Sequence, residues 1–107
     1  MNIYIDYLMK NFGGTNFKGL FQIGKILELY DFNNTNITDI YKDYDQNYNN
    51  NASSERNIRY YIKYIINKYG IKEVEEKINC KCDGNNTFTN KAFMLAIKYR
   101  AEEENGY

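Results

Sequence analysis

The sequence has 107 residues, 43% of them hydrophobic, so it can form one domain with a single core and has little length for a second. Its 14 basic and 14 acidic residues leave no formal net charge, which excludes a protein that coats nucleic acid through charge alone. It has no apolar run of about 18 residues that could span a membrane, and its N-terminus lacks the pattern of a signal peptide, so we expect a cytoplasmic protein.

The apolar residues recur at spacings of three and four, and no proline interrupts them, which predicts helices throughout. The first helix is predicted over residues 2–11 and ends at Gly13-Gly14, because glycine adopts the left-handed cap conformation at little cost. The second is predicted over residues 16–30. Gly19 and Gly24 lie inside it and each cost about 1 kcal/mol relative to alanine, which predicts close helix packing there. Its buried face is expected to contain Phe17, Leu20, Phe21, Leu27 and Tyr30, with Ile23 and Ile26 nearby.

A third helix is predicted after Asn36, whose side chain can cap the first turn, and Asp39 stands near its positive N-terminal end. The apolar residues of this helix are Ile37, Ile40, Tyr41 and Tyr44. The asparagine-rich run 46–51 is short and lies between two periodic segments, so we interpret it as a turn between helices.

The fourth helix has the clearest pattern. Ser53 or Ser54 can cap it, Glu55 lies in its first turn, and Gly70 marks its end. Its inward stripe is predicted to be Ile58, Tyr61, Ile62, Ile65, Ile66 and Tyr69. Its outward stripe is predicted to be Arg56, Arg59, Tyr60, Lys63 and Asn67.

Two further helices complete a predicted all-α, compact bundle of about six helices that forms one domain over residues 1–107. The fifth covers about 72–78 and buries Val74 and Ile78. The last begins at Thr89 or Asn90 and buries Phe93, Met94 or Leu95, Ile97 and Ala101. The loop between them contains Cys80 and Cys82, too few ligands for a closed zinc site in a chain without histidine. We expect reduced thiols there, and a redox or metal role is the alternative.

Residues 36–69 have the order of helix, polar turn and helix that a helix-turn-helix DNA-binding motif requires. Five basic residues and one acidic residue lie between Ser53 and Lys72, so positive charge is concentrated on the second of these helices. Arg56 and Glu55 are the expected base-reading residues, because arginine can pair with guanine and glutamate with cytosine. Phosphate oxygens are the expected partners of the residues further along, Arg59, Tyr60 and Lys63.

A plain amphipathic helix with a solvated basic face is the alternative interpretation of this pattern. An enzyme is not expected, because the chain has no histidine to act as a base, no glycine-rich phosphate loop and no nucleophile elbow. The acidic residues Glu73, Glu75 and Glu76 are expected at the surface. We therefore predict no catalytic residue, no metal and no cofactor.

The order of the residues resembles a known family. The stretch Ile40–Ile62, IYKDYDQNYNNNASSERNIRYYI, resembles the helix-turn-helix in the C-terminal effector domain of stage-zero sporulation protein A, a response regulator of spore-forming Firmicutes. Three further segments resemble the same domain in the same order, namely Phe17–Leu20, Ile71–Glu76 and Thr87–Ile97. The resemblance covers nearly the full chain.

This resemblance implies an all-helical domain that binds specific promoter sites in double-stranded DNA, as a homodimer or in tandem copies, and contacts an RNA polymerase sigma factor. Glu55, Arg56 and Arg59 match DNA-contacting residues of the family, and Tyr60 stands where the family has histidine. One residue is missing near Ser53, together with the family's first base-reading arginine, so a different target sequence is expected. The expected DNA-binding set is Ser53, Ser54, Glu55, Arg56, Arg59, Tyr60 and Lys63.

Two functions remain open from the sequence. The first is a sequence-specific DNA-binding regulator or accessory protein, for example of a phage or plasmid in a Firmicutes host, without a receiver domain to control it by phosphorylation. The second is a protein-interaction module or inhibitor that keeps the fold but does not bind DNA. The second is favoured by the neutral charge, the missing arginine and the glutamates at 73, 75, 76 and 102–104. The family's lysines before the last helix are also missing, because Asn85, Asn86 and Thr87 stand there.

Overall fold

The computed structural model describes all 107 residues and contains six helices and no strand. They are α1 (Ile3–Asn11), α2 (Lys18–Leu29), α3 (Ile37–Tyr48), α4 (Ser54–Tyr69), α5 (Ile71–Ile78) and α6 (Asn90–Glu104). The prediction of an all-α bundle of about six helices is confirmed. No helix has the length and apolar character needed to cross a membrane.

Polar side chains cap three of these helices at predicted positions. The Asn36 side chain accepts the Thr38 N–H at 2.8 Å, the Ser53 hydroxyl accepts the Arg56 N–H at 3.2 Å, and Thr89 accepts the Ala92 N–H at 3.1 Å. Each bond satisfies a backbone donor that has no partner within its own helix. Local sequence therefore fixes where α3, α4 and α6 begin.

The helix α3 continues further than predicted, to Tyr48 inside the asparagine-rich run. Interactions of two side chains hold this last turn. The amide of Asn47 donates to the backbone carbonyl and the carboxylate of Asp43, each at 3.0 Å, and the Tyr48 ring stacks on Tyr44 with centroids 5.7 Å apart. The turn before α4 is consequently limited to residues 49–53.

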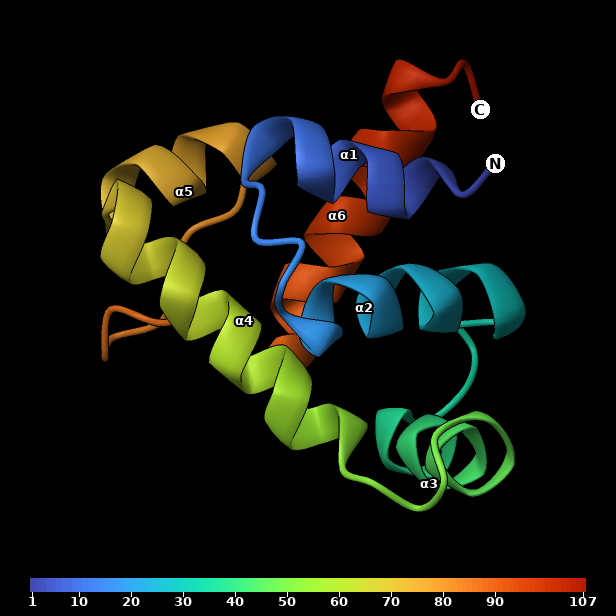
Figure 1. Cartoon of the computed structure of the whole chain (residues 1–107). Coiled ribbons are helices and arrows are strands. Elements are labelled where there is room, and N and C mark those ends of the chain that lie inside the picture. The colour runs from blue at the N-terminus through green and yellow to red at the C-terminus, as the bar shows by residue number, and fades with distance from the viewer.

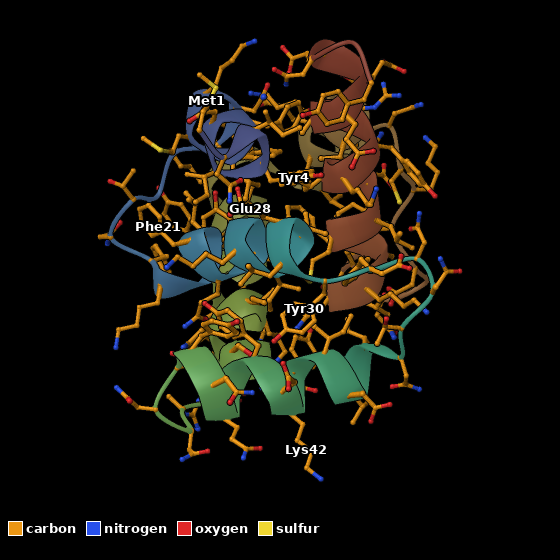
Figure 2. All side chains as sticks on the ribbon, turned by 90° about the vertical axis from the view of Figure 1, so that its right-hand side faces the viewer. Met1, Tyr4, Phe21, Glu28, Tyr30 and Lys42 are labelled. Carbon is orange, nitrogen blue, oxygen red and sulfur yellow. The ribbon has the colours of Figure 1, made fainter.

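In Figure 1, α4 crosses the molecule diagonally, α2 lies beside it, and α5 folds back after Gly70. The two termini lie at the same end, and α3 lies at the opposite end, below α2 in the rotated view of Figure 2. The chain thus brings the N-terminal end of α4 next to α3 and α2.

The two glycines inside α2 lie where other helices approach its backbone. A Cβ atom on Gly19 would lie 2.3 Å from the carbonyl oxygen of Asn57 in α4. One on Gly24 would lie 2.2 Å from Cγ1 of Ile5 in α1. Both distances are too short for a real contact, which confirms the predicted close packing and explains why these positions lack a side chain.

The buried face of α4 packs against the core and thereby holds its exposed face in position. Ile58, Tyr61, Ile62 and Ile65 are buried as predicted, while Ile66 and Tyr69 are half-buried. The hydroxyl of Tyr61 donates to the carbonyl of Gly13 at 2.8 Å, and that of Tyr69 donates to the carbonyl of Phe12 at 3.0 Å. These bonds give the two tyrosine hydroxyls, which are shielded from solvent, hydrogen-bond partners. They also connect α4 to the end of α1.

The predicted core face of α2 needs a correction at Phe21, which is 38% exposed. On a helix, Phe21 shares its face with Lys25 and Glu28, four and seven residues later, and that face points away from the core. Tyr30 is only half-buried, and its hydroxyl donates to the carboxylate of Asp43 at the surface. The buried side of α2 instead consists of Gly19, Leu20, Gln22, Ile23, Gly24, Ile26 and Leu27.

Candidate nucleic-acid interface

The exposed face of α4 carries the predicted stripe. The side chains of Arg56, Arg59, Tyr60 and Lys63 are all exposed, and the Tyr60 side chain is 50% exposed although it is large and partly apolar. Glu55 is also exposed in the first turn. Five of the seven predicted site residues therefore present their side chains on one side of one helix.

The other two predicted site residues have structural roles. Ser53 is half-buried, and its hydroxyl is used as the N-cap of α4. Ser54 is fully buried, with an exposure of 0%, and its hydroxyl has no hydrogen-bond partner. The expectation that Ser54 contacts DNA through its side chain is therefore corrected, because the turn packs this first helical residue against the protein.

The backbone of Ser54 is anchored by α3. Its N–H donates to both carboxylate oxygens of Asp45, at 3.1 and 3.2 Å. A carboxylate at the start of a helix also interacts favourably with the positive end of the helix dipole. This contact holds the N-terminal end of α4, and with it Glu55 and Arg56, at a defined place relative to α3.

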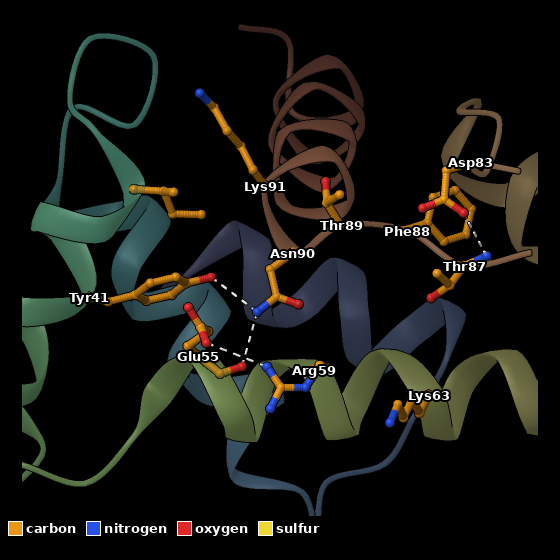
Figure 3. A pocket seen from close by; sticks show the side chains of 11 residues that line it. Tyr41, Glu55, Arg59, Lys63, Asp83, Thr87, Phe88, Thr89, Asn90 and Lys91 are labelled. Atoms are coloured by element: carbon orange, nitrogen blue, oxygen red, sulfur yellow. Dashed lines mark hydrogen bonds and ion pairs between the residues drawn. The ribbon is translucent and has the colours of Figure 1, made fainter. Parts of the chain in front are cut away.

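A cleft of about 460 Å³ lies between α4, the loop after α5 and the start of α6 (Figure 3). Three of its lining residues are cationic and two are acidic. The cations are Arg59, Lys63 and Lys91, and the acids are Glu55 and Asp83. The remaining lining residues are Ile37, Tyr41, Thr87, Phe88, Thr89 and Asn90.

Asn90 fastens the start of α6 to the other two helices at this cleft. Its side-chain amide donates to the hydroxyl of Tyr41 at 3.1 Å and to the backbone carbonyl of Glu55 at 3.0 Å, as Figure 3 shows. Burial raises the pKa of Tyr41 to about 12, so its hydroxyl is neutral at physiological pH. The cleft is therefore bounded by a fixed, uncharged junction of α3, α4 and α6.

Lys91 was missed by the sequence reasoning. It is exposed at the start of α6, and it lines the same cleft as Arg59 and Lys63. Nothing in the local sequence relates it to α4, because it follows Lys63 by 28 residues. The packing of α6 against α4 places Lys91 at this cleft, and its side chain points away from Arg59 and Lys63 in Figure 3.

The exposed cations of α4 have few partners within the chain. The Arg59 guanidinium lies 3.5 Å from the carboxylate of Glu55, and both side chains are about half exposed, so the pair contributes little to stability. No ion pair involves Arg56, Lys63 or Lys91. These groups are available for anionic atoms of another molecule.

Acidic residues are concentrated in and around α3, which lies next to the N-terminal end of α4. Residues 28–48, which include α3, contain five acidic residues and one lysine, whereas residues 53–72 contain one acidic residue and five basic ones. A chain with no formal net charge is thus strongly polarised along its sequence. Such polarisation favours one orientation in an anionic field.

The cysteine pair shows no arrangement for metal binding. Cys80 and Cys82 are free thiols, and no group of three or more histidine, cysteine, aspartate or glutamate residues lies close enough to hold a metal ion. The Glu75 carboxylate accepts the backbone N–H of Cys82 at 2.8 Å. Hydrogen bonding to Glu75 raises the pKa of the Cys82 thiol, which leaves it protonated and weakly reactive near neutral pH.

Comparison with models of protein families gives no match, and no curated protein or solved structure matches the chain. The resemblance to the stage-zero sporulation protein A family therefore rests on the sequence segments Phe17–Leu20, Ile40–Ile62, Ile71–Glu76 and Thr87–Ile97 alone.

Proposed function

We propose that this chain binds double-stranded DNA sequence-specifically, with α3 and α4 acting as a helix-turn-helix and α4 as the helix that enters the major groove. The observation that carries the proposal is the exposed, largely unpaired set of cations on α4. Arg56, Arg59 and Lys63 lie on its outer side in a chain that has no net charge. A protein without net charge can still contact DNA phosphates if its positive charge is concentrated on one rigid helix.

The dimensions of α4 suit this role. Its 16 residues correspond to a helix of about 24 Å, and Arg56 and Lys63 are separated by about 10 Å along it. The major groove is about 12 Å wide and admits one helix. In this proposal Arg56 and Glu55 contact base edges, while Arg59, Tyr60 and Lys63 contact phosphate oxygens where the helix leaves the groove.

Lys91 adds a phosphate contact that the α4 residues alone do not provide. It lines the cleft that Arg59 and Lys63 also line, at the start of α6, and its side chain points away from α4 in Figure 3. A second element that touches the strand next to the groove fixes the register of a recognition helix. In this proposal Lys91 makes the phosphate contact that lysines in the loop before the last helix imply for the stage-zero sporulation protein A family, and that this chain lacks in its own loop.

The proposal is tested by titrating the protein against duplex fragments of its own gene neighbourhood and against a scrambled duplex, at two salt concentrations. Binding to one fragment that exceeds binding to the scrambled duplex about a thousandfold, and that persists at the higher salt, supports sequence-specific recognition. Weak binding that disappears equally from all duplexes leaves only the non-specific phosphate interaction and contradicts it.

A regulatory role for a phage or plasmid in a Firmicutes host, contact with an RNA polymerase sigma factor, and binding as a homodimer or in tandem are parts of the proposal that rest on the family resemblance alone. They require a cytoplasmic protein. Footprinting on the bound fragment checks the tandem arrangement, because two adjacent copies protect twice the length that one copy protects.

The alternative function is a protein-interaction module that does not bind DNA. The observation that favours it is the exposed acidic side of α3, which includes Asp39 and Asp43. The C-terminal glutamates favour it less than the sequence suggested, because each has a basic partner within the chain: Glu102 with Lys98, Glu103 with Arg100 and Glu104 with Lys10. Partners that remain bound after nuclease treatment of a host lysate would support this alternative, and their loss would contradict it.

A further inference from the structure

Gln22 is a polar side chain of α2 that is buried next to the turn before α4. It is 6% exposed, and its Nε2 donates to Oδ1 of Asn49 at 3.2 Å. Its Oε1 is also buried but has no hydrogen-bond partner. Burial of an unpaired amide oxygen costs free energy, and the hydrogen bond to Asn49 is the polar interaction that Gln22 makes in return.

From Asn49 the hydrogen bonds continue to the first residue of α4. The Asn49 side-chain amide donates to Oδ1 of Asp45 at 3.0 Å and to the backbone carbonyl of Ala52 at 3.1 Å. The Asp45 carboxylate in turn accepts the N–H of Ser54. Three side chains thus form a continuous path from α2, through the end of α3, to the start of α4.

Hydrogen bonds also define the backbone of the turn. Asn50 and Asn51 adopt left-handed conformations with φ of 50° and 61°, which asparagine tolerates better than most residues. The Asn51 N–H donates to the carbonyl of Asp45 at 2.7 Å, and the Ala52 N–H donates to that of Asn49 at 2.9 Å. Asn50, Asn51 and Ala52 are all exposed, so no apolar packing fixes their positions.

We propose that Gln22 is a positioning residue for α4: it holds the α3–α4 turn through Asn49, and thereby sets the position of Glu55 and Arg56. This inference rests on the proposed function for its consequence in DNA recognition. Direct packing of Gly19 against Asn57 locates α4 beside α2 one turn further on. Gln22 adds the second point of attachment, at the end of α4 that reads bases in the proposal.

The test is the variant Gln22→Met, which has a side chain of similar length that cannot donate a hydrogen bond. We expect a midpoint of thermal unfolding equal to or above that of the wild type, because the unpaired Oε1 is removed. Amide exchange at Asn51, Ala52 and Ser54 should accelerate about tenfold, and discrimination between the target and the scrambled duplex should fall by a similar factor. A purely structural role predicts instead that stability and discrimination fall together.

Two further variants control this experiment. Ser54→Ala removes the buried unpaired hydroxyl but keeps the N–H that Asp45 accepts, so exchange and discrimination should equal those of the wild type. Asn49→Ala breaks the path at its next member. If Gln22 acts through Asn49, the double variant Gln22→Met with Asn49→Ala should show the same amide exchange and the same discrimination as Asn49→Ala alone.

The exchange measurement uses the free protein, so it separates this inference from the proposed function. Unchanged amide exchange in Gln22→Met would overturn the positioning role of Gln22. Faster exchange would also overturn it if the variant still discriminated between target and scrambled duplex as well as the wild type does. If exchange is faster in Gln22→Met but the wild-type protein binds no duplex, the DNA-binding proposal is overturned. The attachment of the turn by Gln22 is then still supported.

Discussion

The buried and exposed faces of α4 are held by different interactions. On the buried face, Ile58, Ile62 and Ile65 pack in the core with exposures of 1% or less, and Tyr61 donates to the carbonyl of Gly13. On the exposed face, the one ion pair is a half-exposed contact between Glu55 and Arg59, worth about 0.3–0.5 kcal/mol. One face therefore determines whether the helix is folded, and the other is free to determine what it contacts.

The largest expected effect is on the buried face. Ile62→Ala removes a side chain that is 1% exposed and leaves a cavity, which should lower the free energy of unfolding by about 2–5 kcal/mol. Urea denaturation measures this loss. DNA affinity, expressed per folded molecule, should not change. A large loss of affinity in fully folded protein would show that the two faces are not independent.

A smaller loss of stability is expected where α2 meets α4. In Gly19→Ala the new Cβ overlaps the carbonyl oxygen of Asn57, which should lower the free energy of unfolding by about 1–3 kcal/mol despite the better helix propensity of alanine. Gly84→Ala is the matched control, because a Cβ there has no neighbour within 4 Å. Equal stability of the two variants would contradict the close approach of α2 and α4.

On the exposed face, Arg56→Ala should leave the free energy of unfolding within about 0.5 kcal/mol of the wild type. Binding to the target duplex should weaken by about 1–3 kcal/mol, because the bidentate contact to a base is lost. The control is Lys25→Ala, which removes one positive charge from an exposed position on α2. Equal effects of the two variants would mean that only net charge matters.

The smallest effect is expected at Lys91, which contacts a phosphate rather than a base in this account. Lys91→Ala should weaken binding to target and scrambled duplexes alike and reduce the slope of log affinity against log salt by about one. Titrations over a range of salt concentrations measure this slope. A slope equal to that of the wild type would exclude Lys91 from the interface.

Most of the fold could be predicted because its signals are local. Helix caps at Asn36, Ser53 and Thr89 need only a side chain that reaches a nearby N–H, and the apolar spacing of α4 identifies its buried face. The close packing at Gly19 and Gly24 was also predictable, since glycine inside a helix carries a cost that requires a compensating contact.

The features that were missed depend on residues distant in sequence. Ser54 is buried because the turn folds back onto Asp45, nine residues earlier, and no periodicity records that contact. Lys91 lines the same cleft as Arg59 and Lys63 only through the packing of α6. The role of Gln22 depends on Asn49, 27 residues later, and a single polar residue on an apolar helix face gives no indication of its partner.

We propose that α4 and the start of α6 contact DNA. Backbone amide chemical shifts of the labelled protein, recorded while the target duplex is added, test it most directly. We expect the largest changes at residues 55–63 and at Asn90 and Lys91, with little change on α1. Changes confined to the acidic side of α3, or no change at any duplex concentration, would contradict the claim.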